Sequence, residues 1–64
     1  MRIQTTYAHA KEMEASYRDV AALHARAGRA ERADKLDRRA DWWADRAYDA
    51  WMIEADAQVR RDWL

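Results

Sequence analysis

The 64-residue chain contains no cysteine, no proline, no phenylalanine and a single glycine. Without cysteine it can form neither disulfides nor thiolate metal sites, and two histidines alone cannot hold a structural zinc ion. So few turn-forming residues exclude a barrel or sandwich of many short strands. A chain of this length buries only about 60% of the surface that its unfolded form exposes. We therefore expect one small all-α domain over residues 1–64, stabilised by packing or oligomerisation, with no metal and no cofactor.

The chain also has no net charge, because 12 basic side chains balance 12 acidic ones. The chain as a whole therefore has no charge that would attract nucleic acid or an acidic membrane. No apolar run approaches the roughly 20 residues of a membrane span, and residues 1–6 lack the apolar stretch of a signal peptide. We expect no membrane partner and a cytoplasmic protein, and the abundance of Ala, Arg and Asp points to a bacterial or phage source.

The first half of the chain has the pattern of an amphipathic helix. Thr5 and Thr6 are candidate N-caps, because a threonine hydroxyl can accept from the unpaired amides of a first turn. Spacings of three and four residues predict a seam that packs on another helix. It comprises Ala10, Met13, Tyr17, Val20, His24 and Ala27. Gly28 suits the left-handed position that ends a helix. We predict a helix from about residue 7 to residue 27.

A second helix is predicted to start directly after Gly28, at about residue 30. Its seam repeats the same spacing through Ala33, Leu36, Ala40, Trp43, Ala47 and Ala50. Two matching seams joined by a short turn predict an antiparallel helical hairpin. Folding the chain back at Gly28 places Trp43 near Tyr17, and Ala40 near Val20.

Residues 17–40 resemble a single tetratricopeptide repeat, a family of paired helices that stack into adaptor solenoids. The matching positions are Tyr17, Val20, Ala21, Gly28, Ala33 and Ala40. The chain departs from the repeat at Asp37, where the family has an aromatic residue, and it contains no second copy. The resemblance implies the hairpin geometry and not the adaptor function.

Beyond Ala50 the apolar residues change direction around the helix. In this part of the chain the seam gives way to a second apolar stripe, which is turned by roughly 120° from the seam. It comprises Tyr48, Met52, Ala55, Val59 and Trp63. Either one helix of some 33 residues outruns the first helix as a long-armed hairpin, or a kink near Asp49 starts a third helix. We favour a small three-helix bundle in which Ile3 and Tyr7 help to cover the stripe, with dimerisation through this end as the alternative.

The sequence offers no set of residues suited to catalysis. Ser16, His9 and His24 are the candidate nucleophile and bases, and the two histidines lie fifteen residues apart on one predicted helix. That separation is about 22 Å along the axis, so they cannot act on one bond. No glycine-rich phosphate loop or triad spacing is present. We expect a protein that is not an enzyme.

Five aspartates recur along the second helix at spacings of three and four residues. We call them the acidic ridge: Asp34, Asp37, Asp41, Asp45 and Asp49. Like charges four residues apart on a helix destabilise it by roughly 0.2–0.5 kcal/mol per pair. Arg38 and Arg46 can relieve part of this repulsion, as in a solvated, salt-bridged face. The other interpretation is functional, because charges about 6 Å apart resemble successive phosphates and fit a basic groove on another protein.

Trp42 lies about 140° from the seam, among basic residues of the second helix. These are Arg32, Lys35, Arg39, Arg46 and Arg60. We predict cation–π contacts between Trp42 and its arginine neighbours, and a protein-binding role, since tryptophan is enriched at interface hot spots. The interleaved Glu31, Asp34 and Asp37 repel phosphate, so direct binding of nucleic acid is not expected.

In size, in residue usage and in its acidic ridge, the chain resembles anti-CRISPR proteins, the small phage or mobile-element inhibitors of bacterial immunity. The resemblance implies a partner with a basic nucleic-acid-binding surface, such as a CRISPR effector subunit, with the acidic ridge in place of target DNA and Trp42 beside it. The alternative is a homo-oligomeric helical interaction module. In that case Tyr48, Met52, Val59 and Trp63 pack against their own copies, as a homodimer for example.

Overall fold

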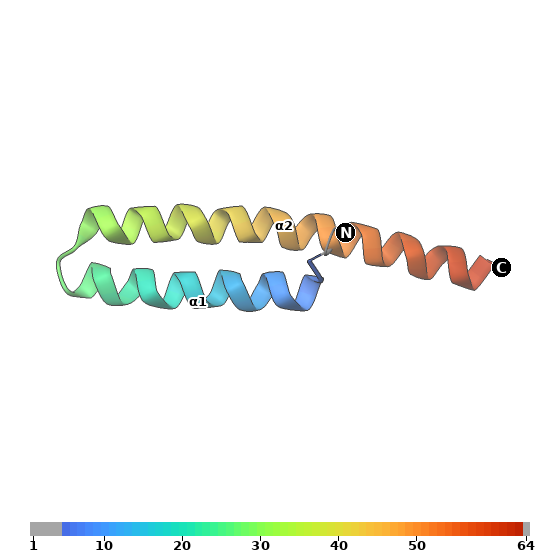
Figure 1. Cartoon of the computed structure of the whole chain (residues 1–64), viewed down its shortest axis with the longest axis horizontal. Coiled ribbons are helices and arrows are strands. Elements are labelled where there is room, and N and C mark those ends of the chain that lie inside the picture. The colour runs from blue at the N-terminus through green and yellow to red at the C-terminus, as the bar shows by residue number, and fades with distance from the viewer. Residues whose placement is uncertain (1–4, 64) are drawn as a thin grey trace.

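A computed structural model describes residues 5–63 of the chain as two antiparallel helices joined by one tight turn (Figure 1). Helix α1 spans Tyr7–Arg26 and helix α2 spans Ala30–Trp63. The described residues contain no strand, so the predicted all-α hairpin is confirmed. The molecule measures 55 × 23 × 12 Å and has a radius of gyration of 15.4 Å. A compact chain of this length would have about 11 Å, so the hairpin is a rod rather than a globule.

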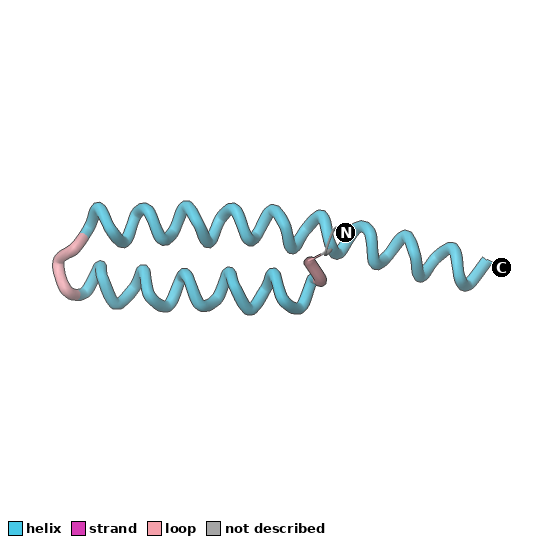
Figure 2. The backbone as a smooth tube through the Cα atoms, viewed as in Figure 1, coloured by secondary structure: helices cyan, strands magenta, loops and turns pink. Residues whose placement is uncertain are grey.

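The two ends of α1 follow the predicted capping chemistry. The Thr6 hydroxyl accepts a hydrogen bond from the backbone N–H of His9 at 3.1 Å, which caps the first turn. At the other end Gly28 has a φ of 78°, a conformation that glycine adopts without steric cost. The Gly28 N–H donates to the carbonyl of Ala25, and the Arg29 N–H donates to that of His24. This pair of bonds is a Schellman motif, and it turns the chain into α2 (Figure 2).

Helix α2 runs without a break for 34 residues, so the expected three-helix bundle is wrong and the long-armed hairpin is right. No glycine or proline interrupts residues 30–63, and a break would have left backbone hydrogen bonds unmade. Ile3, which was expected to cover the third helix, lies outside the described residues.

The start of α1 lies beside Glu54, whose carboxylate accepts a hydrogen bond from the Tyr7 N–H at 3.0 Å. Residues 55–63, here called the C-terminal extension, therefore continue past α1 for about 13 Å (Figure 1).

The seam between the helices is lined almost entirely by alanine. Its buried residues are Ala10 and Ala21 of α1, and Ala33, Ala40, Ala47 and Ala50 of α2. The four α2 residues all belong to the predicted seam. On α1 the prediction is wrong by one residue, because Ala21 is buried whereas Val20 is exposed. Ala21 carries the smaller side chain, which allows the two backbones to approach closely, so packing favours it over its neighbour.

The larger seam residues lie along the edges of the contact. Met13, Tyr17, His24, Leu36 and Trp43 are half-buried, and none is fully enclosed. The Trp43 ring packs edge-on against His9, with 5.7 Å between ring centroids. Its indole N–H is buried and has no acceptor among residues 5–63. The hairpin therefore has a thin core in which every fully enclosed side chain is a methyl group.

Candidate interaction surfaces

The acidic ridge is present as a row of exposed carboxylates along α2. Two of its members are engaged by α1. Arg18 donates to Asp41, with 3.1 Å between Nη2 and Oδ1, and its Nη1 lies 3.9 Å from Asp37. The same guanidinium reaches Glu14 one turn away on α1, at 3.0 Å. Arg18 therefore joins the two helices on this side of the hairpin.

These contacts shift the titration of the groups around Arg18. The hydrogen bond to Asp41, followed by that to Glu14, raises the pKa of Arg18. Hydrogen bonds from Lys11 and then Arg18 lower the pKa of Glu14, because both cations favour its charged form. Lys11 lies 2.9 Å from Glu14, and that bond raises the pKa of Lys11 in turn. Lys11, Glu14 and Arg18 are thus each held in the charged form at neutral pH.

The rest of the acidic ridge lacks the salt bridges to Arg38 and Arg46 of α2 that were expected to reduce repulsion between its carboxylates. Arg38 makes no salt bridge to Asp34 or Asp41, and Arg46 makes none to Asp49. Among residues 5–63, Asp34, Asp45 and Asp49 have no salt bridge at all. The expected pairing on α2 is therefore wrong, and three carboxylates of the acidic ridge remain available to an outside partner.

Trp42 stands between two arginines on the other flank of α2. The guanidinium carbon of Arg39 lies 4.5 Å from the centre of its ring, and that of Arg46 lies 5.2 Å away. The predicted cation–π contacts are therefore present. Trp42 also packs edge-on against Trp43, with 4.9 Å between ring centroids, and remains 42% exposed. Neighbours on three sides hold the ring in one orientation at the surface.

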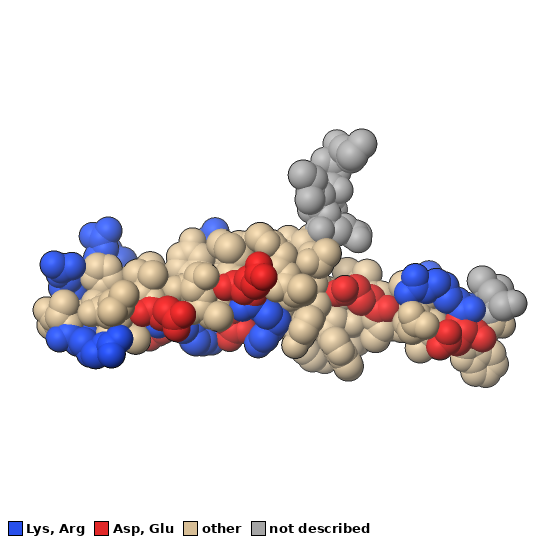
Figure 3. All heavy atoms as spheres, turned by 90° about the horizontal axis from the view of Figure 1, so that it is seen from below, with Lys and Arg blue, Asp and Glu red and all other residues tan. Residues whose placement is uncertain are grey.

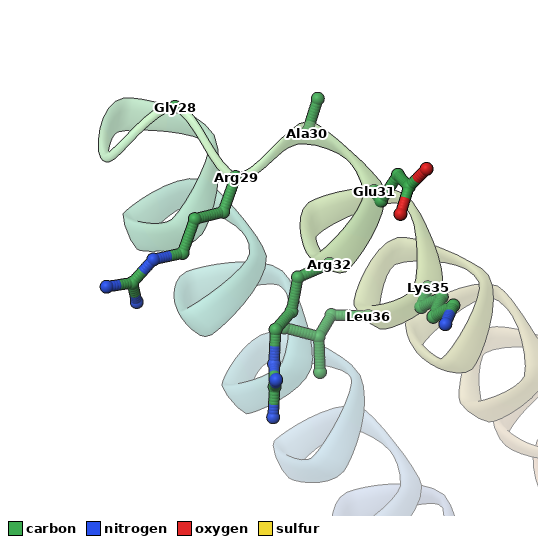
Figure 4. A pocket seen from close by; sticks show the side chains of 7 residues that line it. All are labelled: Gly28, Arg29, Ala30, Glu31, Arg32, Lys35 and Leu36. Atoms are coloured by element: carbon green, nitrogen blue, oxygen red, sulfur yellow. The ribbon is translucent and has the colours of Figure 1, made fainter.

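The turn end of the hairpin is basic. A shallow depression beside the turn is lined by Arg29, Arg32 and Lys35, with Glu31 and Leu36 among them (Figure 4). In Figure 4 the Arg29 and Glu31 side chains point away from each other, so no ligand cage forms there. Seen from the α1 side, basic groups gather at the turn, and acidic and basic groups alternate over the rest of that face (Figure 3).

The apolar stripe of α2 is uncovered. Tyr48, Met52, Val59 and Trp63 are all exposed, and Ala55 is half-buried. Trp51 is also exposed and lies next to Tyr48, with 6.3 Å between the ring centroids. Within residues 5–63 no third helix packs on these side chains, and α1 begins beside Glu54, so it does not reach Val59 or Trp63. A run of large apolar residues therefore faces solvent along the end of the rod.

The residues considered for catalysis are dispersed. His9 and His24 both lie on α1, fifteen residues apart, and Ser16 is exposed between them. The Nδ1 atom of His24 is 3.5 Å from Arg29 at the turn. Among residues 5–63, no three histidine, aspartate or glutamate side chains come together as a candidate metal site. Neither α1 nor α2 has a stretch long and apolar enough to cross a membrane.

Sequence reasoning missed three residues that organise these surfaces. Arg18 and Glu54 each contact the other helix, and spacing along one helix does not show which residue of the other helix they meet. Glu54 did carry a signal, because it occupies the seam direction directly after Ala50, where a charged residue needs a partner. Trp51 lies about 80° from the centre of the apolar stripe and widens it toward α1.

Comparison of the chain with protein-family models, with curated proteins and with solved structures finds no match.

Proposed function

We propose that this chain is a non-catalytic helical interaction protein, and that association with another macromolecule completes its fold. The observation that supports this is the composition of the core, because the six residues buried in the described part of the chain are all alanine. A buried methyl group contributes about 0.8 kcal/mol, against about 1.5–3 kcal/mol for a whole Val, Leu, Ile, Phe or Met side chain. Most of the larger apolar side chains lie outside the core.

The distribution of these side chains decides where a partner would bind. Among residues 5–63, ten large apolar residues are exposed, and six of them lie in the second half of α2: Tyr48, Trp51, Met52, Ile53, Val59 and Trp63. Helices in proteins gain most of their stability from packing an amphipathic face. The C-terminal extension has such a face and no helix of its own chain against it. A partner surface would therefore stabilise α2 as well as bind it.

The test is to measure the helicity of the free chain at high dilution by circular dichroism. We expect partial helicity and a broad thermal transition when no partner is present. A fully helical monomer with a sharp, concentration-independent transition would show that the alanine seam is sufficient, and the proposal would be wrong.

A second candidate function is inhibition of a nucleic-acid-binding protein through the acidic ridge. It is favoured by Asp34, Asp45 and Asp49, which make no salt bridge to any residue of the described part of the chain. Carboxylates that are free of internal partners can pair with the arginines and lysines of a basic groove. The partner would be a protein that binds nucleic acid, such as a CRISPR effector subunit, and the chain would occupy its groove in place of target DNA.

This candidate is tested by competition with DNA for such an effector. The triple substitution Asp34→Asn, Asp45→Asn and Asp49→Asn should abolish both competition and its salt sensitivity. A matched control removes three acidic charges elsewhere, through Glu12→Gln, Asp19→Asn and Asp62→Asn. Equal losses in the two variants would indicate that only net charge matters and would rule out a specific role for the acidic ridge.

A further inference from the structure

The apolar stripe and the acidic ridge lie on the same side of α2, one after the other. At 100° per residue their mean directions differ by about 20°. The acidic ridge covers residues 34–49, and the apolar stripe covers residues 48–63. One side of a single helix is therefore acidic over its first half and apolar over its second. A partner surface that packs on the apolar stripe and extends past Tyr48 toward the turn would meet the carboxylates of the acidic ridge.

The spacing within the apolar stripe is nearly the same in both chain directions. Reversing residues 48–63 exchanges Tyr48 with Trp63 and Met52 with Val59, and it brings Ala55 next to its own position. Large residues thus meet large residues at both ends, and the small Ala55 lies at the centre. This symmetry is what a two-fold antiparallel contact between two copies requires.

We propose that two copies of this chain form an antiparallel dimer through the apolar stripe, with Tyr48 of each copy against Trp63 of the second copy and Met52 against Val59. This inference rests on the proposed function and names the partner. The two hairpins would then point away from each other, joined through residues 48–63.

Electrostatics favours this arrangement over a parallel dimer. Helices that pack together lie about 8–10 Å apart. A parallel pair through this side of α2 would bring Asp41 and Asp45 of one copy beside the same residues of the other, and like charges at an interface are repulsive. In the antiparallel arrangement the two acidic ridges lie at opposite ends of the dimer, and the carboxylates that remain close to each other are the two Asp56 side chains, each paired with Arg60 of its own copy at 3.1 Å.

The antiparallel register also brings opposite charges together at the edge of the contact. Asp49 and Arg60 lie on the same flank of the apolar stripe. Arg60 of the second copy would come within about two residues, or 3 Å along the axis, of Asp49. Arg60 reaches Asp56 of its own copy at 3.1 Å, and both side chains are largely exposed, so in the dimer Arg60 can lie between Asp56 and Asp49 of the second copy.

The available area is sufficient for a specific dimer. Tyr48, Trp51 and Trp63 are 62%, 52% and 86% exposed, so two copies together expose the equivalent of about four whole aromatic side chains. At 150–250 Å² each this is roughly 600–1,000 Å². With Met52 and Val59 added, it reaches the approximately 1,000 Å² expected of a biological interface.

The experiment uses cysteine pairs, because the chain has no cysteine of its own. Met52→Cys and Val59→Cys variants are oxidised separately and as a mixture. We expect a disulfide-linked dimer in the mixture only, since residue 52 faces residue 59 and lies about 10 Å along the axis from residue 52 of the second copy. Ala57→Cys, on the opposite side of α2, is the control and should remain uncrosslinked in every mixture.

Two other outcomes would overturn the inference. Disulfide formation by Met52→Cys alone would indicate a parallel dimer. Sedimentation of the parent chain as a monomer at all concentrations would show that the second copy is not the partner. That second result would leave the proposed function intact if the monomer is only partly helical, because the partner would then be a different macromolecule. A fully helical, stable monomer would instead contradict the proposed function itself.

Discussion

Replacing Gly28 with alanine tests the geometry on which the hairpin depends. Gly28 has a φ of 78°, and a Cβ atom built at this position would meet nothing within 4 Å. The substitution therefore adds no clash, and its cost is the left-handed conformation alone. That conformation costs a non-glycine residue about 1–2 kcal/mol. The ratio of closed hairpin to open chain should fall by a factor of roughly 5–30.

The open form has a predictable shape, because good helix formers flank position 28. Ala27, Arg29 and Ala30 favour continuation of the helix once residue 28 no longer favours a turn. A continuous helix would separate residues 8 and 57 by about 74 Å. In the hairpin both positions are exposed and lie near the start of α1.

The assay is a distance measurement between spin labels on Ala8→Cys and Ala57→Cys. The parent chain should give a single short distance, and Gly28→Ala should add a population near the helical value. Gly28→Asn is the control, because asparagine tolerates the left-handed region better than alanine does. Identical distance distributions and unfolding free energies in the parent and the alanine variant would refute this account of the turn.

Three further predictions concern the contacts between the helices. Ala40→Leu should destabilise the hairpin by about 1–3 kcal/mol in chemical unfolding, because it overpacks a fully buried site, whereas Ala22→Leu on the exposed side of α1 should change stability little. Glu54→Gln should weaken the cap on α1 by roughly 0.3–1 kcal/mol, seen as faster amide exchange at Tyr7, since a neutral amide interacts less with the helix dipole. The lowered pKa of Glu14 means that its stabilisation is present above the ordinary carboxyl pKa and is lost as pH falls through the lowered value. In an acid titration Glu14→Gln should therefore lose less stability than the parent chain, and equal losses would contradict this assignment.

Local chemistry accounts for the parts of the fold that the sequence predicts well. Thr6 caps α1 and Gly28 ends it through interactions within five residues, and the alanines of α2 recur at a regular spacing. The choice between Val20 and Ala21 at the seam depends on how closely the helices approach, which spacing alone does not specify. The third helix was expected because the apolar stripe needs a cover, yet residues 30–63 contain no residue that would break α2.

For the candidate surfaces too, the sequence predicts features set within one helix better than contacts between the two helices. The exposure of Trp42 follows from its angle around α2 and was predicted. The direction of the apolar stripe was also predicted, but its expected cover by a third helix was wrong. The partners of the acidic ridge were not, because Arg18 lies 23 residues from Asp41 and meets it only after the chain folds back. Pairing within α2 was the expectation from sequence, but Arg18 of α1 contacts Asp37 and Asp41 instead, and Arg46 lies over the Trp42 ring.

The overlap of the two helices is closed at both ends, by the Schellman turn at Gly28 and by the bond from Tyr7 to Glu54. The number of residues between these two contacts, here called latches, is therefore fixed in each helix. A single inserted residue in α1 would rotate everything on one side of it by about 100° and unseat a latch, whereas a matched pair of whole heptads, one in each helix, would restore both. Beyond Glu54 no such counting rule applies, so the rod can be lengthened there, or spliced to another helix, without disturbing the hairpin.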